Sequence, residues 1–190
     1  MSTASGHHVF ETRLGFFALA WSGAGLTHVA LPEATHEAAM RHVAKWGFTS
    51  GDGDGTGSPL PDFVAETVER ITRYAQGEPV DLAAMPLDLS GIDGFRRAIY
   101  AAALKLGFGD VVTYGELAER AGFPKMARET GQALGRNPMP LVVPCHRIVA
   151  AGGKIGGFSA PGGAVTKERL LAHEGVRVGP PEPAQATFAF

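Results

Sequence analysis

The spacing of apolar residues divides this sequence into a sheet-forming beginning and a largely helical remainder. Three short β-prone runs come first, at residues 9–12, 16–22 and 26–31. Gly23 and Gly25 mark a turn between the last two runs, because glycine is favoured where the chain reverses sharply. Short β-prone runs joined by such turns predict an antiparallel meander.

After the third run, the apolar residues have the spacing of helices. One helix is predicted over residues 33–46. Its apolar residues at positions i, i+4 and i+7 are Ala39, Val43 and Trp46. A second helix is predicted to be capped by Asp62 and to end near Gly77. Residues 47–61 between the two are rich in Gly and Asp, which predicts a flexible loop.

The second half of the chain is predicted to begin after a linker at residues 86–91. It opens with a helix that has one apolar stripe. The stripe consists of Phe95, Ile99, Ala102 and Leu106. Further on, residues 140–144 are β-prone, and a last helix is predicted to be capped by Thr166 and closed by Gly175.

Two short helices are predicted in the middle of the second half. Thr113 and Glu116 have the spacing of a capping box, so a helix should start there and stop at Gly122. Pro124 suits the first turn of a following helix that ends before Asn137. Two such helices with a tight turn between them form a helix-turn-helix pattern, which is typical of DNA-binding proteins.

The charge of the chain is distributed unevenly. Residues 1–91 carry 5 Lys and Arg against 11 Asp and Glu, whereas residues 92–178 carry 12 against 7. A basic half is what binding to a polyanion such as DNA requires. Small domains also differ by several charges by chance, and the charge count alone does not decide between these two interpretations.

The single cysteine, Cys145, limits what the protein can contain. It excludes an internal disulfide and a zinc site built from several cysteines, so we expect no metal. No apolar run approaches the roughly 20 residues of a membrane span, and nothing indicates a secretory signal. We therefore expect a cytoplasmic protein without a membrane partner.

The segment Pro144-Cys145-His146-Arg147 carries the candidate chemistry. A thiol becomes a good nucleophile when ionised, and a free cysteine with a pKa of about 8.5 is mostly protonated at neutral pH. A histidine oriented by a carboxylate can take the proton, and His146 and Glu174 are the candidates. Neighbouring side chains on a strand point to opposite faces, so either the chain turns at Cys145 or a water carries the proton. A small buried cysteine without reactivity is the alternative interpretation.

The residues around this segment make the pattern specific. They are Asn137-Pro138-x-Pro140-x-x-x-Pro144-Cys145-His146-Arg147-Ile148-Val149, Lys167-x-x-Leu170-Leu171-x-x-Glu174-Gly175, Val112-Thr113-Tyr114-Gly115-Glu116-Leu117-Ala118 and Gly131-x-Ala133-Leu134-x-x-Asn137. The pattern resembles the O6-alkylguanine-DNA alkyltransferase family. The resemblance is close over residues 86–176 and weak over the first half.

The resemblance implies an α/β fold of two domains. Residues 1–89 would form an N-terminal ribonuclease-H-like domain. Residues 90–178 would form a C-terminal winged-helix-like domain that contains the helix-turn-helix and the active site. Residues 179–190 are predicted to be a flexible tail.

The resemblance also implies roles for individual residues. Cys145 would accept the alkyl group, and His146 would act through a water as the base, oriented by Glu174. Asn137 would brace the turn that presents the cysteine. Tyr114 would help to rotate the nucleotide out of the duplex and would donate a hydrogen bond to the leaving guanine.

Further residues are implied in binding. Arg128 would fill the gap in the base stack. The DNA-binding set is Arg128, Gly131, Gln132, Gly135 and Thr113. The substrate pocket would be lined by Tyr114, Ile148, Phe158 and Ser159. The loop between Gly156 and Lys167 departs from the commoner family form by an inserted Ala160-Pro161 pair, which leaves the width of the pocket open.

The implied function is direct reversal of DNA damage. The protein would move a methyl or other alkyl group from O6-alkylguanine in double-stranded DNA to Cys145 once per molecule. O4-alkylthymine is a second candidate substrate. No cofactor is expected, and we expect a monomer. The alternatives are a lesion-binding protein without transfer and a cysteine hydrolase.

Overall fold

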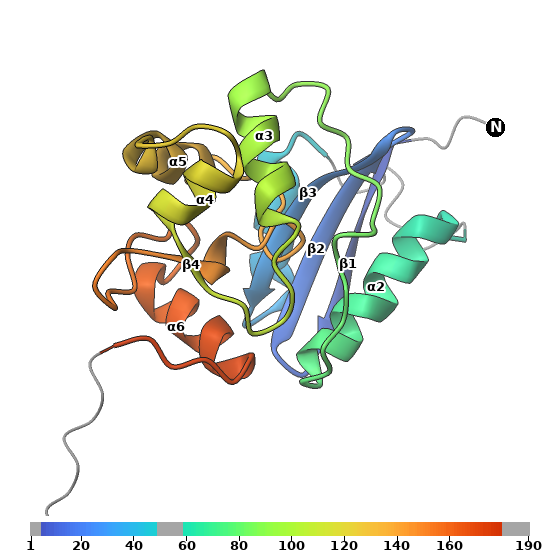
Figure 1. Ribbon diagram of the computed structural model, residues 1–190. Coiled ribbons are helices and arrows are strands. Elements are labelled where there is room, and N and C mark those ends of the chain that lie inside the picture. Colours follow the sequence, from blue (N-terminus) through green and yellow to red (C-terminus); the bar gives the residue numbers. More distant parts are fainter. Residues whose placement is uncertain (1–4, 49–58, 180–190) are drawn as a thin grey trace, which may run out of the picture.

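The first half of the chain is built on the predicted antiparallel meander (Figure 1). The computed structural model describes residues 5–48 and 59–179. Its first three strands are β1 (Gly6–Thr12), β2 (Gly15–Ser22) and β3 (Gly25–Glu33). Each pairs with the next in antiparallel register, so β2 lies in the middle of the sheet and β1 and β3 form its edges. The predicted meander is therefore confirmed.

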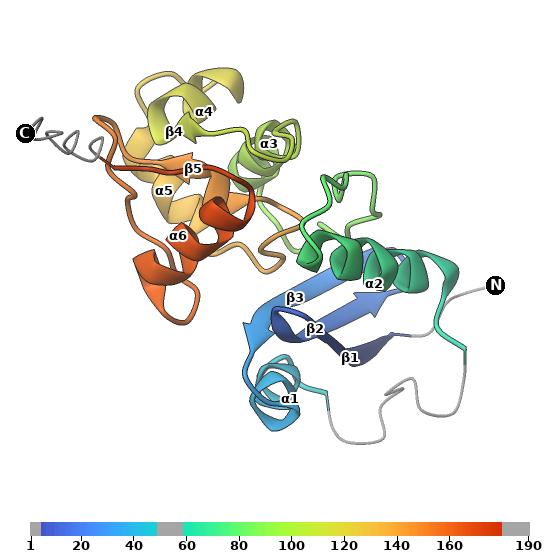
Figure 2. The same cartoon turned by 90° about the horizontal axis from the view of Figure 1, so that it is seen from below.

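Two helices cover the two faces of this sheet (Figure 2). They are α1 (His36–Lys45) and α2 (Asp62–Ala75). On one face Ala18 and Ala30 pack with residues of α1, and their small side chains let the helix approach closely. The neighbouring residues of β2 point to the opposite face, where they join a larger core together with α2.

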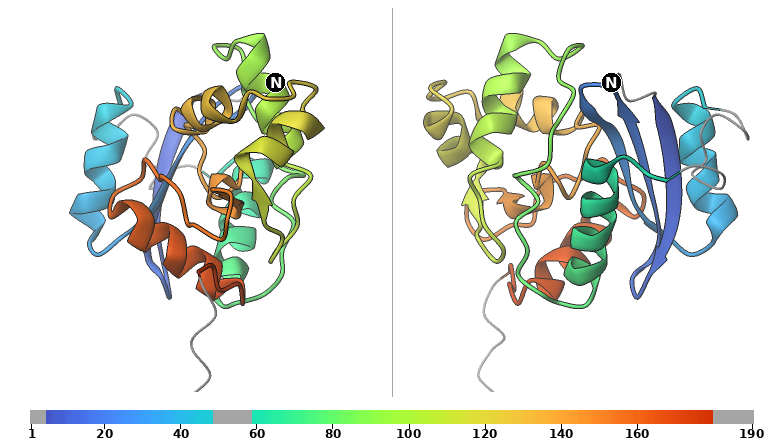
Figure 3. Two further views of the ribbon diagram at one scale, coloured as in Figure 1. Left: turned by 60° about the vertical axis from the view of Figure 1, so that its left-hand side comes forward. Right: turned by 90° about the vertical axis from the view of Figure 1, so that its right-hand side faces the viewer.

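The second half lies on the same side of the sheet as α2 (Figure 3). Its elements are α3 (Gly94–Ala103), β4 (Val112–Thr113), α4 (Tyr114–Arg120), α5 (Ala127–Leu134), the 3₁₀ turn η1 (Cys145–Arg147), β5 (Ile148–Val149) and α6 (Gly163–His173). The strands β4 and β5 pair in parallel. Buried side chains of both halves form one continuous apolar cluster, so the two halves are packed against each other in a mixed α/β fold.

The segment predicted as a linker is fixed to the edge of the sheet. The backbone N–H of Leu26 donates to the carbonyl of Pro86, and that of Asp88 donates back to Leu26, both over 2.8 Å. Gly25 adopts a φ of +146°, and a Cβ atom there would lie 2.6 Å from the carbonyl oxygen of Pro86. Only glycine permits this close approach, which joins the two halves at β3.

The helix-turn-helix has the predicted start. The hydroxyl of Thr113 accepts from the backbone N–H of Glu116 over 3.2 Å, and the Glu116 carboxylate accepts from the N–H of Thr113 over 2.7 Å. This reciprocal pair confirms the capping box. Gly122, in the left-handed region with a φ of +85°, follows the end of α4 as expected.

Two other predicted helix starts are wrong. The second helix of the pair, α5, begins at Ala127 rather than near Pro124, because Lys125 has a φ of +68° and a residue in the left-handed region cannot continue a helix. The last helix, α6, is preceded by Gly162 rather than capped by Thr166. The Thr166 hydroxyl lies within the helix and donates to the carbonyl of Pro161 over 2.6 Å.

Two smaller differences concern Asp62 and residues 140–144. Asp62 is the first residue of α2 and the cap is Pro61, without a side-chain hydrogen bond. Residues 140–144 form a turn with one isolated bridge between Pro140 and Val143. Parts of the predicted loop 47–61 and of the predicted tail 179–190 lie outside the described residues. Among the helices of residues 5–48 and 59–179, none is long and apolar enough to cross a membrane.

Candidate active site

The turn before η1 holds Cys145 in place through the side chain of Asn137. The Asn137 amide donates to the carbonyl of Val143 over 2.9 Å, and its oxygen accepts from the N–H of Met139 over 3.0 Å. Leu141, at the middle of this turn, has a φ of +74°, which costs energy for a residue with a side chain. The two hydrogen bonds of Asn137 hold the backbone in this unfavourable conformation.

The same amide reaches the thiol. Asn137 Nδ2 lies 3.4 Å from Cys145 Sγ. Burial raises the pKa of Cys145, whereas the hydrogen bond from Asn137 and the charge of Lys167 act to lower it. An N–H donor favours the thiolate over the thiol. The turn therefore positions the sulfur, and the Asn137 hydrogen bond offsets part of the rise in pKa that burial causes.

The 3₁₀ turn decides how Cys145 and His146 lie. Their side chains do not alternate across a strand, because the chain turns at these residues, which was one of the two possibilities left open by the sequence. His146 is fully buried and its Nε2 lies 2.7 Å from Glu174 Oε1. Its other ring nitrogen, Nδ1, has no hydrogen-bond partner within the described part of the chain.

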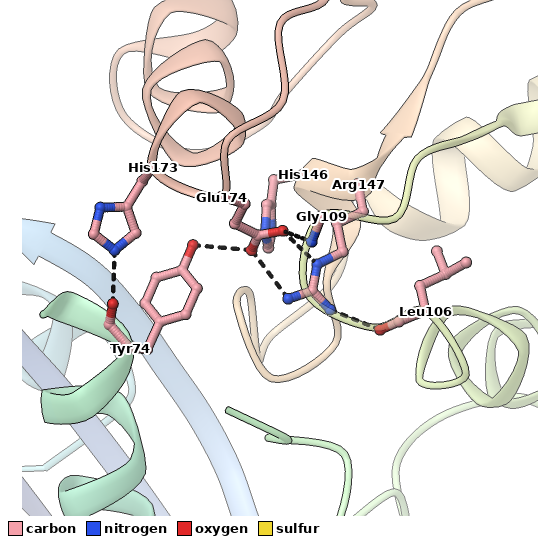
Figure 4. Close-up of polar contacts among 7 residues, drawn as sticks. All are labelled: Tyr74, Leu106, Gly109, His146, Arg147, His173 and Glu174. Carbon is pink, nitrogen blue, oxygen red and sulfur yellow. Dashed lines mark hydrogen bonds and ion pairs between the residues drawn. The ribbon is translucent and has the colours of Figure 1, made fainter. Parts of the chain in front are cut away.

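The buried Glu174 carboxylate contacts the polar groups of four residues (Figure 4). It accepts from Tyr74 Oη and the backbone N–H of Gly109 over 3.0 Å each, and from Arg147 Nε and Nη2 over 2.9 and 3.0 Å. Burial alone would raise the pKa of Glu174, but the hydrogen bonds from His146 and Arg147 outweigh it and hold the pKa at about 2. Glu174 is therefore ionised at neutral pH.

An ionised Glu174 fixes the state of the histidine. A carboxylate can only accept, so His146 Nε2 must carry a proton. Burial lowers the pKa of His146 despite the opposing effect of Glu174, which favours the neutral ring. The lone pair of the neutral ring is then on Nδ1, the nitrogen left without a partner.

A cavity of about 570 Å³ opens beside the thiol. Its walls contain eight of the residues predicted to act in the site. They are Tyr114, Arg128, Gly131, Gln132, Gly135, Cys145, Phe158 and Ser159. Two of the predicted DNA-binding and pocket residues do not line it: Ile148 is fully buried, and Thr113 caps α4. The predicted catalytic residues Asn137, His146 and Glu174 lie behind Cys145 and are not part of its walls either. The cavity therefore brings α5, Cys145 and the loop after Gly156 to one place.

Tyr114 and the buried Lys167 form a second polar group at this cavity. The Tyr114 hydroxyl donates to the carbonyl of Gly157 over 3.0 Å. The Lys167 ammonium donates to Tyr114 Oη over 3.3 Å and to the carbonyls of Gly157 and Ile148. Burial lowers the pKa of Lys167 to about 8. Gly156 is needed beside them, because with a φ of +77° a Cβ there would lie 3.1 Å from the Tyr114 ring.

Comparison with known proteins places the chain in a family. The family described as 6-O-methylguanine DNA methyltransferase, DNA binding domain, matches residues 94–176. The methylated-DNA–protein-cysteine methyltransferase of Mycobacterium tuberculosis is 32% identical over 165 residues, which cover 87% of this chain and 88% of that protein. This chain belongs to the methylated-DNA–protein-cysteine methyltransferase family. The human protein of that name is 47% identical over 90 residues, which cover 47% of this chain and 42% of the human protein.

Solved structures extend this similarity to the fold. The Mycobacterium tuberculosis OGT in complex with DNA aligns with a TM-score of 0.67 at 30% identity and covers 88% of this chain and 91% of that one. The O6-methylguanine-DNA methyltransferase of Pyrococcus kodakaraensis aligns with a TM-score of 0.66 at 26% identity, over 90% and 99% of the two chains. The mixed α/β fold is therefore that of this family over nearly the whole length.

Three residues of this methyltransferase site received no role in the sequence analysis. Arg147 and Tyr74 bind the Glu174 carboxylate, and Lys167 binds Tyr114. Arg147 and Lys167 are part of the family pattern quoted above. A charged residue without an assigned role at these positions was the signal that could have pointed to them. Tyr74 lies 100 residues before Glu174, and no local pattern connects the two. Within residues 5–48 and 59–179, no cluster of three or more His, Cys, Asp or Glu could hold a metal ion.

Proposed function

We propose that this protein repairs alkylated guanine in double-stranded DNA by transferring the alkyl group to its own Cys145. The observation that carries the proposal is the position of the thiol. Cys145 stands at the wall of a cavity bordered by the second helix of a helix-turn-helix, with a histidine and an ionised carboxylate behind it. Membership of the methyltransferase family supports the same reaction, and a related OGT has been crystallised in complex with DNA.

The thiolate is proposed to form through the neutral His146. A water between Sγ and Nδ1 would accept the thiol proton and pass a proton to the ring, whose Nδ1 has no other partner among the residues that the structure describes. Glu174 then stabilises the imidazolium through its 2.7 Å contact with Nε2. The arrangement is that of a catalytic triad with a sulfur nucleophile and an interposed water.

The transfer itself is a displacement at the alkyl carbon. A bond forms between Cys145 Sγ and that carbon, the bond from the carbon to guanine O6 breaks, and its electron pair goes to the guanine. Tyr114 is proposed to donate a hydrogen bond to the departing guanine in place of its present bond to Gly157. The product is a thioether that no neighbouring group hydrolyses readily, so the protein reacts once and no cofactor is required.

Guanine O6 lies within the base pair, so the nucleotide must leave the stack before it can reach Cys145. We propose that α5 enters the DNA groove and that Arg128 fills the vacated position. Arg128 is exposed and borders the cavity together with Gly131, Gln132 and Gly135. The two glycines let the helix backbone come close to the DNA, and Thr113 starts the preceding helix.

For the architecture we propose a ribonuclease-H-like domain over residues 1–89 and a winged-helix-like domain over residues 90–178. The antiparallel sheet with a helix on each face supports the first. The helix pair α4–α5 beside the strands β4 and β5 supports the second. We further propose that the protein acts as a monomer in the cytoplasm, where reducing conditions keep a reactive thiol free.

The proposal is tested by incubating the protein with excess O6-benzylguanine and recording its intact mass over time. We expect one added benzyl group per molecule, mapped to the peptide of Cys145, and release of one guanine. Repeated release of guanine without an adduct would instead indicate a cysteine hydrolase. Absence of an adduct from benzylguanine and from DNA containing O6-methylguanine would indicate a lesion-binding protein.

The role of Arg128 leads to a separate prediction. Arg128→Ala is expected to slow transfer from a methylated duplex by about ten- to a hundredfold, because extrusion of a base costs a few kcal/mol and nothing fills the gap. Reaction with free benzylguanine should change by less than about twofold, since no base stack is involved. Single-turnover rates with the two substrates measure this difference. Arg120→Ala, which removes an equal charge from α4, is the matched control, and an equal loss with both substrates in Arg128→Ala contradicts the role.

A further inference from the structure

A separate cavity lies between the two halves of the chain. Its volume is about 470 Å³. Residues 79–83 of the first half form one part of its wall, and residues 104–108 and parts of the segment 141–147 form the rest. None of these residues lines the cavity beside Cys145. The reaction proposed above therefore makes no use of this space.

The guanidinium of Arg147 is the buried polar group of this cavity. An arginine side chain carries five N–H donors. Nε and Nη2 of Arg147 each donate one hydrogen bond to Glu174, and Nη1 donates one to the carbonyl of Leu106 over 2.7 Å. Nη1 and Nη2 each have a second N–H, which has no partner among the residues that the structure describes.

These two N–H groups favour a ligand that brings an acceptor. Arg147 is only 6% exposed and is part of the cavity wall. A buried N–H without an acceptor is costly, because it has lost its bonds to water and gained none in return. One oxygen atom in the cavity could accept from both terminal nitrogens of Arg147, since a carbonyl oxygen has two lone pairs.

The charges around the cavity decide which kind of acceptor fits. The charge of Arg147 is already balanced by Glu174, whose carboxylate lies 2.9 Å from Nε. Among the other described wall residues, only Asp81 and Lys105 are charged, and they have opposite signs. A carboxylate ligand would have to share one guanidinium with Glu174, and two like charges so close together disfavour each other. An uncharged carbonyl group avoids this repulsion.

The remaining walls suit an apolar body. They include Leu82, Leu104, Phe108 and Val142. A cavity of roughly 150 Å³ is sufficient to hold benzene in a protein interior, so about 470 Å³ holds a ring together with a carbonyl substituent. We propose that this cavity is a binding site for small uncharged aryl amides and ketones. The carbonyl oxygen accepts from Arg147, and the ring packs against the apolar side chains.

A titration of the ¹⁵N-labelled protein with acetanilide, followed by NMR, tests the site. We expect saturable shifts of the Arg147 Nε–H signal and of the backbone amides of residues 79–83 and 104–108. Half-saturation is expected at about 1 mM, which is ordinary for a ligand of this size. Shifts confined to residues around Cys145, or no saturation up to the solubility limit of acetanilide, overturn the proposal.

Phenylacetate tests the preference for an uncharged ligand. It matches acetanilide in size but carries a carboxylate. We expect it to bind at least about fivefold more weakly, because its charge is repelled by Glu174. Phenylacetate that binds as tightly as acetanilide contradicts the proposed ligand class.

A pair of variants tests the location of the site. Ala83→Phe places a ring in the cavity from its wall and should raise the half-saturation concentration by about tenfold or more, because ring and ligand clash. Ala84→Phe adds the same ring at the next residue, which is exposed and does not line the cavity. It should change the concentration by less than about twofold. Undiminished binding to Ala83→Phe rejects the site.

A second filling variant covers the case in which Ala83→Phe does not fold, which its amide spectrum shows directly. Gly107→Phe fills the cavity from another segment of the wall. A Cβ atom at Gly107 would meet the Asp110 carboxylate at 3.4 Å, so the substitution is accommodated by a small shift of that side chain. Unchanged binding to Gly107→Phe rejects the site as well. No alkyl transfer enters these measurements, so their outcome is independent of the proposed function.

Discussion

Cys145→Ser is expected to reduce alkyl transfer by on the order of a thousandfold or more, because a serine hydroxyl is a weak nucleophile at its ordinary pKa. The substitution replaces sulfur by a smaller oxygen at a site that accepts a hydrogen bond from Asn137. Serine also accepts a hydrogen bond there, so the turn should keep its conformation. The measurement is the rate at which a radiolabelled methyl group moves from duplex DNA to protein.

The Cys145→Ser variant is also expected to bind DNA as the wild type does. Affinity for a methylated duplex should stay within about twofold of the wild type, because contacts to the DNA backbone supply most of the binding free energy. Loss of transfer with retained binding assigns Cys145 to the chemical step. If the variant still transferred the methyl group at a measurable rate, another nucleophile would have to be sought and the proposed reaction would be wrong.

Glu174→Ala is expected to lower the free energy of unfolding by about 3–5 kcal/mol, the cost of removing one partner of a buried ion pair. Arg147 would lose two hydrogen bonds and its counter-charge, and Tyr74 and Gly109 would each lose an acceptor. Urea unfolding at neutral pH measures the loss. Transfer should also fall, because His146 is no longer held with its proton on Nε2.

The pH dependence of stability gives an independent test of the same residue. Folding lowers the pKa of Glu174 from its ordinary 4.5 to about 2, so the ionised carboxylate stabilises the fold above about pH 4.5. That contribution is lost as the pH falls from about 4.5 toward 2, because the unfolded chain binds the proton first. Glu174→Gln keeps the shape without the charge and should flatten the stability curve in this window.

The control for both measurements is Glu168→Ala, which removes an exposed carboxylate from α6. It should change stability by less than about 0.5 kcal/mol, the usual range for surface substitutions. A Glu174→Ala protein as stable as this control would show that the buried network contributes little. A Glu174→Gln curve as steep as that of the wild type would place the acid-sensitive group elsewhere.

Sequence patterns predicted the elements that are determined by residues close together in the chain. The meander β1–β3 follows from alternating apolar runs and glycine turns, and the start of α4 follows from two side chains three residues apart. The wrong starts of α5 and α6 have backbone causes, since Lys125 and Gly162 adopt positive φ angles that composition does not reveal. The turn at residues 140–144 depends on one hydrogen bond that Asn137 donates to Val143 and one that it accepts from Met139. The β-propensity of these residues does not reveal such contacts.

The site could be predicted where the family pattern supplied the residues, and only there. The structure brings Asn137, Cys145, His146 and Glu174 together. The sequence could not show that Tyr74 reaches Glu174 from α2 or that Lys167 is buried against Tyr114, because these contacts arise from packing between distant segments. Whether adjacent Cys145 and His146 lie on a strand or in a turn was also a matter of tertiary structure.

The carboxylate of Glu174 also links the two halves of the chain. Tyr74 of α2 donates a hydrogen bond to it, as do Gly109 and Arg147 of the second half. Nearby, His173 Nε2 lies 2.6 Å from the carbonyl oxygen of Tyr74. A motion that parted the halves would break the contacts of Tyr74 with Glu174 and His173, and would thereby expose the carboxylate that supports His146. These contacts tie the two halves together around the histidine. In the reaction proposed above, we therefore expect the main movement to be that of the nucleotide, which leaves its helix to reach a thiol already in place.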